Sequence, residues 1–190
     1  IVPKNHTLII KNGVEFILKK NGVFINNGTV ILGEKTDTNI LDFLNKKNLN
    51  FSKVSFFSKK KSIFYNNGEI IFYNSFFKNI SFFNKKNVIN IFNSYFLNCD
   101  FISNFSEINI NNCLFNNVYF LKESCYNFSI TNSIIYNSLK LNNINCLNSF
   151  NINNCALINT GGFNLNIDKT TNISNSFFLK NSVVFNIKKS

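Results

Sequence analysis

Arginine, glutamine, methionine and tryptophan are absent from the 190 residues, and His6 is the single histidine. Without arginine, the chain lacks the planar donor that makes two hydrogen bonds at once to a base or a phosphate, which argues against specific nucleic-acid binding. One histidine and the lack of a Cys-x-x-Cys pair argue against a zinc site. Because the chain does not begin with methionine, we expect it to be part of a longer protein, with any signal peptide outside it.

Carboxylates are scarce, with nine Asp and Glu against twenty Lys. They are scattered, whereas acid–base catalysis needs a close pair and a calcium site needs a cluster of oxygen ligands. The sequence therefore predicts no catalytic, cofactor-binding or metal-binding residue, and a chain that is not an enzyme. The nine carboxylates are Glu15, Glu34, Asp37, Asp42, Glu69, Asp100, Glu107, Glu123 and Asp168.

One short phrase recurs seven times along the chain. A Ser or Cys returns every 19 to 22 residues, is preceded by Asn in all but the first case, and is followed two residues later by an apolar side chain. Such a period predicts stacked coils, each too small to bury its own apolar face. The recurring small residues are Ser55, Ser75, Ser94, Cys113, Ser133, Cys155 and Ser176.

The apolar positions around each small residue predict strands. They fall five and three residues before it and two after it, which is the period of a strand with alternate side chains inward. A further apolar column falls eight residues after it, so each coil should hold about three strands. The variable spacing favours a right-handed over a left-handed β-helix. We therefore expect an all-β, right-handed parallel β-helix with about 20 residues per coil and roughly nine coils.

Asn recurs in two columns, directly before each small residue and four residues after it. Successive coils of a β-helix lie about 4.8 Å apart, so stacked Asn side chains can pass amide hydrogen bonds from coil to coil. Asn also tolerates the left-handed backbone that a sharp corner needs. We interpret both columns as structural ladders rather than as ligand contacts.

The first 50 residues use different turns, with short apolar runs separated by Asn12-Gly13, Asn21-Gly22 and Asn27-Gly28. With Val2-Pro3 and Thr7-Leu8, this stretch resembles the opening coils of secreted bacterial right-handed β-helix proteins of the pectate-lyase-like superfamily. The later Asn-(Ser/Cys)-x-Phe-x-Asn phrases are similar to coils of surface adhesins in that superfamily. We thus expect one β-helix domain over residues 1–190, with opening coils in 1–50 and regular coils in 51–190.

That resemblance implies a fold and an extracellular or cell-surface location, but no single activity, because the fold carries lyases, hydrolases, tailspikes and inert stalks. A pectate lyase of the superfamily needs clustered carboxylates for calcium and a basic residue, usually Arg. A polygalacturonase needs several Asp on one strand face. The scattered carboxylates match neither pattern.

A competing register exists locally. Residues 94–98 and 99–103 scan as two pentapeptide repeats, and Phe77/Phe82 and Phe115/Phe120 repeat the spacing of five. This would suit the four-sided helix of pentapeptide-repeat proteins. It fails elsewhere, because a large Ile or Phe occupies the position where that family has a small residue.

Lysines are concentrated in the first part of the chain, with 14 of the 20 at or before Lys86. Clustered near turns, they could form a strip that binds an acidic polysaccharide or another polyanion. The alternative, which we favour, is that Lys at turns keeps a Phe-rich solenoid soluble and discourages edge pairing. The candidate polyanion-binding residues are Lys46, Lys47, Lys59, Lys60, Lys61, Lys85 and Lys86.

The five cysteines do not form a recognisable framework of disulfides. Cys113 and Cys155 replace Ser in the small-residue column and should lie two coils, about 9.6 Å, apart, which is too far for a disulfide. Cys125 and Cys146 should lie on neighbouring coils within bonding reach, although parallel side chains disfavour a bridge.

Our leading hypothesis is a non-catalytic structural or binding module of an extracellular or surface protein, with a glycan as its ligand. A first alternative is a fragment of a polysaccharide lyase or glycoside hydrolase whose active residues lie outside these residues. A second is an intracellular scaffold that uses the Lys strip. We expect no cofactor and no transmembrane segment, and either further coils of the same chain or end-to-end self-association.

Overall fold

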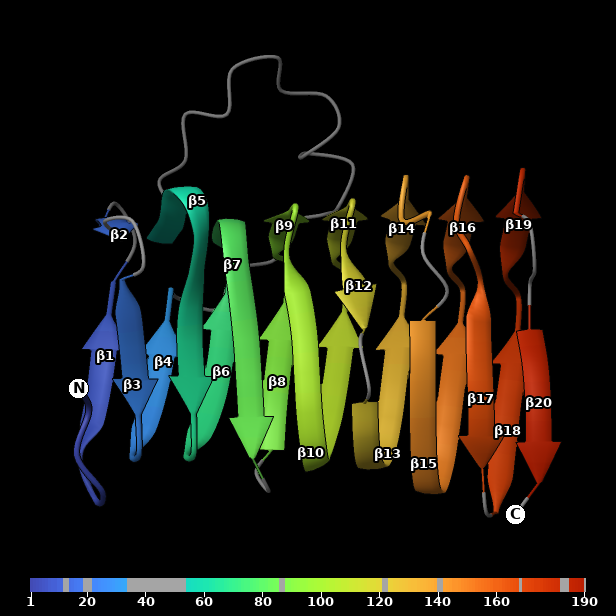
Figure 1. Ribbon diagram of the computed structural model, residues 1–190, viewed down its shortest axis with the longest axis horizontal. Coiled ribbons are helices and arrows are strands. Elements are labelled where there is room, and N and C mark those ends of the chain that lie inside the picture. The colour runs from blue at the N-terminus through green and yellow to red at the C-terminus, as the bar shows by residue number, and fades with distance from the viewer. Residues whose placement is uncertain are drawn as a thin grey trace.

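The computed structural model describes residues 1–11, 14–18, 22–33, 54–85, 88–120, 123–139, 142–167, 169–181 and 185–189. In this part of the chain the regular elements are strands, and the strand pairings are parallel. The strands lie side by side in the order of the sequence along the long axis of the molecule (Figure 1). The predicted all-β parallel solenoid is confirmed.

Three rows of stacked strands make up the described coils. Row A contains β1 (Thr7–Ile10), β4 (Thr29–Leu32), β6 (Glu69–Tyr73), β8 (Val88–Phe92), β18 (Thr170–Ser174) and the second parts of β10 (Asp100–Asn111), β13 (Glu123–Thr131) and β15 (Asn142–Asn153). Row B contains β2 (Glu15–Leu18), the first parts of β5 (Val54–Asn66) and β7 (Ser75–Lys85), β9 (Tyr95–Leu97), β11 (Leu114–Asn116), β14 (Ile134–Tyr136), β16 (Ala156–Ile158) and β19 (Phe177–Leu179). Row C contains β3 (Val23–Asn26), the second parts of β5 and β7, the first parts of β10, β13 and β15, β12 (Tyr119–Phe120), β17 (Phe163–Ile167) and β20 (Phe185–Lys189).

Most coils are 19 to 22 residues long, but one is twice that length. Thr29 pairs with Glu69, and Phe24 with Phe64, so the offset between these neighbouring strands is 40 residues. Residues 34–53 fall within this interval and lie outside the described residues. Because one coil takes up the length of two, row A has eight stacked strands. The number of coils is therefore smaller than the roughly nine that we expected.

Stacked phenylalanines fill much of the interior. In row B the rings of Phe77, Phe96 and Phe115 lie parallel, with centroids 4.9 and 5.2 Å apart. Burying aromatic rings removes large apolar areas from water, and the offset stacks add a further contribution of about 0.5–1.5 kcal/mol per pair. The inward position of this column is confirmed, because all three side chains are completely buried.

In row C the buried column differs from the one marked by the sequence. The apolar residues eight positions after the small residue include Phe83 and Ile102, which are only half-buried. The residues one position earlier, Phe82 and Phe101, are almost fully buried and stack with centroids 4.8 Å apart. An Asn in the left-handed conformation separates rows B and C, so the alternation of inward and outward side chains slips by one residue.

The Asn columns form the corners of the solenoid, as predicted. All eleven Asn that precede a small residue by one or follow it by four have positive φ, between 47° and 58°. Several of their side chains hydrogen-bond from coil to coil. Asn112 Nδ2 donates to Asn93 Oδ1 at 2.7 Å, and Asn117 Nδ2 donates to Asn98 Oδ1 at 3.1 Å. The structure therefore confirms the asparagine ladders. The eleven residues are Asn74, Asn93, Asn112, Asn132, Asn154, Asn175, Asn79, Asn98, Asn117, Asn137 and Asn159.

The small residue is selected for its hydroxyl or thiol as well as for its size. Ser94 Oγ donates to the carbonyl oxygen of Phe92 at 2.8 Å and accepts from the backbone N–H of Ser75, one coil earlier, at 3.1 Å. Ser133 Oγ likewise accepts from the backbone N–H of Cys113 at 3.0 Å. Each such side chain satisfies backbone groups that the sharp corner removes from the ladder between strands.

Candidate functional site

The structure describes little of the predicted Lys strip. Lys46, Lys47 and Lys86 lie outside the described residues. The three residues 59–61 belong to β5, at the junction of rows B and C, where four extra residues separate Phe57 from Ser62 in the pairing with β7. Their side chains also lie outside the description, and Lys85 is exposed at the end of β7. The strip therefore stays a hypothesis.

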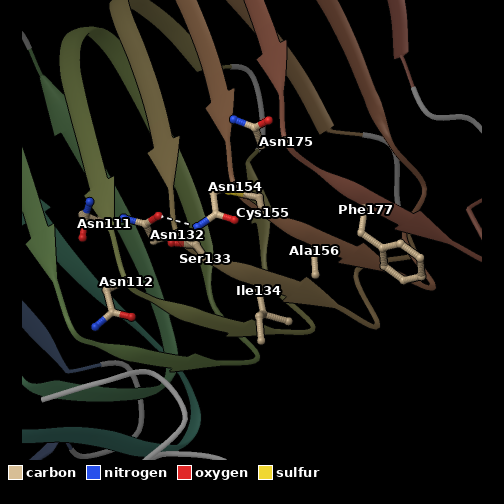
Figure 2. Close-up of a pocket in the computed structure, with 10 residues that line it drawn as sticks. All are labelled: Asn111, Asn112, Asn132, Ser133, Ile134, Asn154, Cys155, Ala156, Asn175 and Phe177. Atoms are coloured by element: carbon tan, nitrogen blue, oxygen red, sulfur yellow. Dashed lines mark hydrogen bonds between the residues drawn. The ribbon is translucent and has the colours of Figure 1, made fainter.

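A groove instead lies at the corner between rows A and B in the C-terminal part of the solenoid. Its lining comes from four successive coils, and Figure 2 shows the side chains in a line across neighbouring strands. Its volume is about 620 Å³, within the usual range of ligand sites. The lining residues are Asn111, Asn112, Asn132, Ser133, Ile134, Asn154, Cys155, Ala156, Asn175 and Phe177.

One wall of the groove consists of carboxamides. The corner residues Asn112, Asn132, Asn154 and Asn175 supply it because the corner holds them all in the left-handed conformation. Asn154 Nδ2 donates to Asn132 Oδ1 at 2.8 Å, which fixes both amides in one orientation (Figure 2). A ladder step uses one N–H and one lone pair, and a carboxamide has two of each, so such a wall can also bind polar groups of a ligand.

The opposite wall is apolar. Ile134, Ala156 and Phe177 are paired residues of β14, β16 and β19 and point outward from row B. The Phe177 ring is 57% exposed, whereas Ile134 and Ala156 are half-buried. The two walls are joined through Ser133 and Cys155, which lie between the corner Asn and the apolar residue in each coil.

The lining of the groove has no charged side chain. Burial raises the pKa of the Cys155 thiol to about 11, and that of Cys113 in the same inward column to about 12, so both are neutral at neutral pH. Each thiol acts as a hydrogen-bond donor, with Cys155 Sγ 3.3 Å from the carbonyl oxygen of Asn153. Amides beside an apolar surface can bind an uncharged polar ligand, but they provide neither a nucleophile nor a general base.

Comparison with protein-family models, curated proteins and solved structures found no match. The fold is thus the level at which the resemblance to the pectate-lyase-like superfamily agrees with the structure. In the described ranges, no three His, Cys, Asp or Glu side chains gather as metal ligands would. Nor does that part of the chain contain a helix long and apolar enough to cross a membrane.

The apolar wall was missed by reading the inward columns alone. The position directly after the small residue is apolar in each of six successive coils, although it points outward from row B. A strand with one face in water normally alternates apolar and polar side chains. The six residues that depart from this rule are Phe76, Tyr95, Leu114, Ile134, Ala156 and Phe177.

Proposed function

We propose that this chain is a non-catalytic binding module of an extracellular or cell-surface protein, and that the groove between rows A and B binds a neutral glycan. The observation that supports this most directly is the pairing of a carboxamide wall with an apolar wall. Sugars combine hydroxyl groups, which amides bind, with apolar C–H faces, which pack against aromatic rings. The groove repeats once per coil, about 4.8 Å, which is comparable with one pyranose unit of an extended glycan.

Two finer expectations belong to the same proposal. The coils wind to the right, as the variable spacing and the strong preference of parallel strand connections favour. The chain derives from a β-helix protein of the pectate-lyase-like superfamily, which the Asn-Gly turns of the opening coils and the Asn-(Ser/Cys) phrases support. Neither expectation is needed for the groove to bind a glycan.

Binding of immobilised cellulose, xylan and mannan, followed by calorimetry with soluble oligosaccharides, tests the proposal. We expect Phe177→Ser to weaken binding at least tenfold, about 1.4 kcal/mol, because the exposed ring is the largest part of the apolar wall. Leu139→Ser is the matched control, since Leu139 is also exposed, at 65%, but does not line the groove. Equal affinity of Phe177→Ser and the parent chain would place the ligand elsewhere.

The same incubations separate binding from catalysis. A binding module leaves the polysaccharide intact, whereas a lyase or hydrolase releases new reducing ends. Release that persists in the purified chain would favour the enzyme alternative.

A second candidate function is polyanion binding by the Lys strip, which the excess of Lys in the first part of the chain supports. Without Arg the attraction would come from point charges, so binding to heparin should be weak and lost at a few hundred millimolar salt. Changing Lys59, Lys60 and Lys61 together to Ser should reduce retention on heparin without affecting stability. Unchanged retention would move this site, and no retention at low salt would leave the lysines a role in solubility alone.

A further inference from the structure

Two cysteines of neighbouring coils meet inside the solenoid. Cys125 of β13 pairs with Cys146 of β15 in row C, and both side chains are completely buried. Their Sγ atoms are 2.7 Å apart, closer than two sulfur atoms in ordinary van der Waals contact. This contact is independent of the groove and of any ligand.

The backbone at this position suits a disulfide. Paired residues of adjacent parallel strands have Cα atoms about 4.8 Å apart, and disulfides join Cα atoms about 4.4–6.8 Å apart. In a regular parallel ladder the side chains would point in one direction and keep the sulfurs apart. Here the pairing of β13 with β15 shifts register directly after Cys125, and the pairing of β10 with β13 shifts at Cys125 as well. These irregularities allow the two sulfurs to converge.

The other cysteines have different surroundings. Cys113 and Cys155 belong to one column but are separated by Ser133, whose Oγ accepts from the backbone N–H of Cys113 at 3.0 Å. Cys99 Sγ lies 3.3 Å from the carbonyl oxygen of Leu97 and 3.6 Å from that of Phe77.

We propose that Cys125 and Cys146 form a disulfide that joins two neighbouring coils when the protein folds in an oxidising compartment. A small-molecule disulfide serves as the oxidant. One cysteine thiolate attacks it, forms a mixed disulfide and releases one small thiol. The second thiolate then attacks the protein sulfur of the mixed disulfide, forms the bond between Cys125 and Cys146 and releases the second small thiol. The two cysteines lose two protons and two electrons, and the oxidant is reduced to two thiols.

The test uses the purified chain carrying Cys155→Ser, because trypsin leaves Cys146 and Cys155 in one peptide, 141–169, and Cys125 alone in 123–140. The chain is incubated with oxidised glutathione at a denaturant concentration below the unfolding midpoint, where coils open locally. We expect the intact mass to fall by two hydrogen atoms and the two peptides to be linked until reduced. Closing this loop should raise the Tm by roughly 5–10 °C.

Cys125→Ser and Cys146→Ser should each abolish the mass change, whereas Cys113→Ser should leave it intact. Circular dichroism of each variant shows whether it has folded before oxidation. The proposal is overturned if folded protein prepared under oxidising conditions still titrates as fully reduced after unfolding. It is equally overturned if the linked peptides join Cys99 or Cys113 instead.

Discussion

The interior of the solenoid is filled in two ways along its length. Up to β12, rows B and C contribute stacked aromatic rings, ending with Phe115 and Phe120. In the following coils, row B contributes Ile135 and Leu157 instead, and a buried asparagine, Asn142, lies beside Phe120. The same backbone coil therefore accepts an aromatic and a partly polar filling.

The polar filling is possible because its side chains bond to backbone groups. Asn142 accepts from the backbone N–H of Phe120 at 2.9 Å and donates to the carbonyl oxygen of Gly162 at 3.0 Å. Ser138 Oγ accepts from the backbone N–H of Val118 at 3.1 Å. A buried polar group is tolerated when its hydrogen bonds are made, so the difference between the regions is one of packing against bonding.

The largest effect is expected in the aromatic region. Phe96→Asp places a carboxylate between Phe77 and Phe115 without a partner, which costs several kcal/mol and should abolish cooperative folding. Lys78→Asp, at an exposed position one coil away, should change stability by less than about 0.5 kcal/mol. Thermal unfolding followed by circular dichroism measures both. If the two variants melt alike, the inward position of Phe96 is wrong.

The polar region should break differently. Asn142→Leu retains the volume but leaves the Phe120 N–H and the Gly162 carbonyl without their partner, at about 1–3 kcal/mol each. We expect a loss of about 2–5 kcal/mol in the free energy of unfolding by urea. Asn145→Ala, at an exposed position of the same strand, is the control and should be nearly neutral. A neutral or stabilising Asn142→Leu would mean that the interior there is already apolar in character.

The corners are shared by both regions, and their contribution should be smaller. Asn132 has φ of 50° and accepts a hydrogen bond from Asn154. Asn132→Ala should cost about 1–2 kcal/mol for the left-handed backbone and about 1 kcal/mol for the ladder. Asn132→Gly relieves the backbone term and loses only the ladder. Equal losses for Ala and Gly in urea unfolding would show that the backbone conformation is not the cause.

The smallest expected effect is a gain. Lys180 occupies the second corner column in the last described coil, with φ of 54°, where the preceding coils have Asn. Lys180→Asn should stabilise the chain by about 0.5–1 kcal/mol, because Asn adopts this conformation more readily than Lys. Lys169→Asn, at an exposed position outside the corner columns, is the matched control. A gain in Tm for both variants would point to charge rather than to the corner.

The repeat predicted the fold because its signals are local. The period of the small residue, the alternation around it and the Asn before each corner specify the strands and turns of one coil, and the coils then stack in order. The slip at the corner was not predicted, since it depends on the left-handed conformation of residues such as Asn79 and not on hydropathy alone.

The register of the long coil carried a signal that the period of 20 obscured. Residues 23–32 and 63–72 share a pattern of apolar residues around Asn-Asn-Gly, 40 residues apart. In the structure these turns stack, and Asn26 Nδ2 donates to Asn66 Oδ1 at 2.7 Å. A Cβ on Gly68 would lie 1.7 Å from the carbonyl oxygen of Gly28, so the close approach requires glycine. The groove, in contrast, needed knowledge of which outward residues share a corner.

The most direct test of the stacked coils is a pair of distances along row A. Ile9, Ile71 and Asn172 occupy one outward column, with Ile71 and Asn172 five strands apart and Ile9 and Asn172 seven strands apart. With spin-labelled unnatural amino acids at these positions, pulsed electron paramagnetic resonance should give about 24 Å for the first pair and about 34 Å for the second. Distances that do not lengthen from the first pair to the second, or a second distance below about 25 Å, would contradict a solenoid in which each strand adds one step.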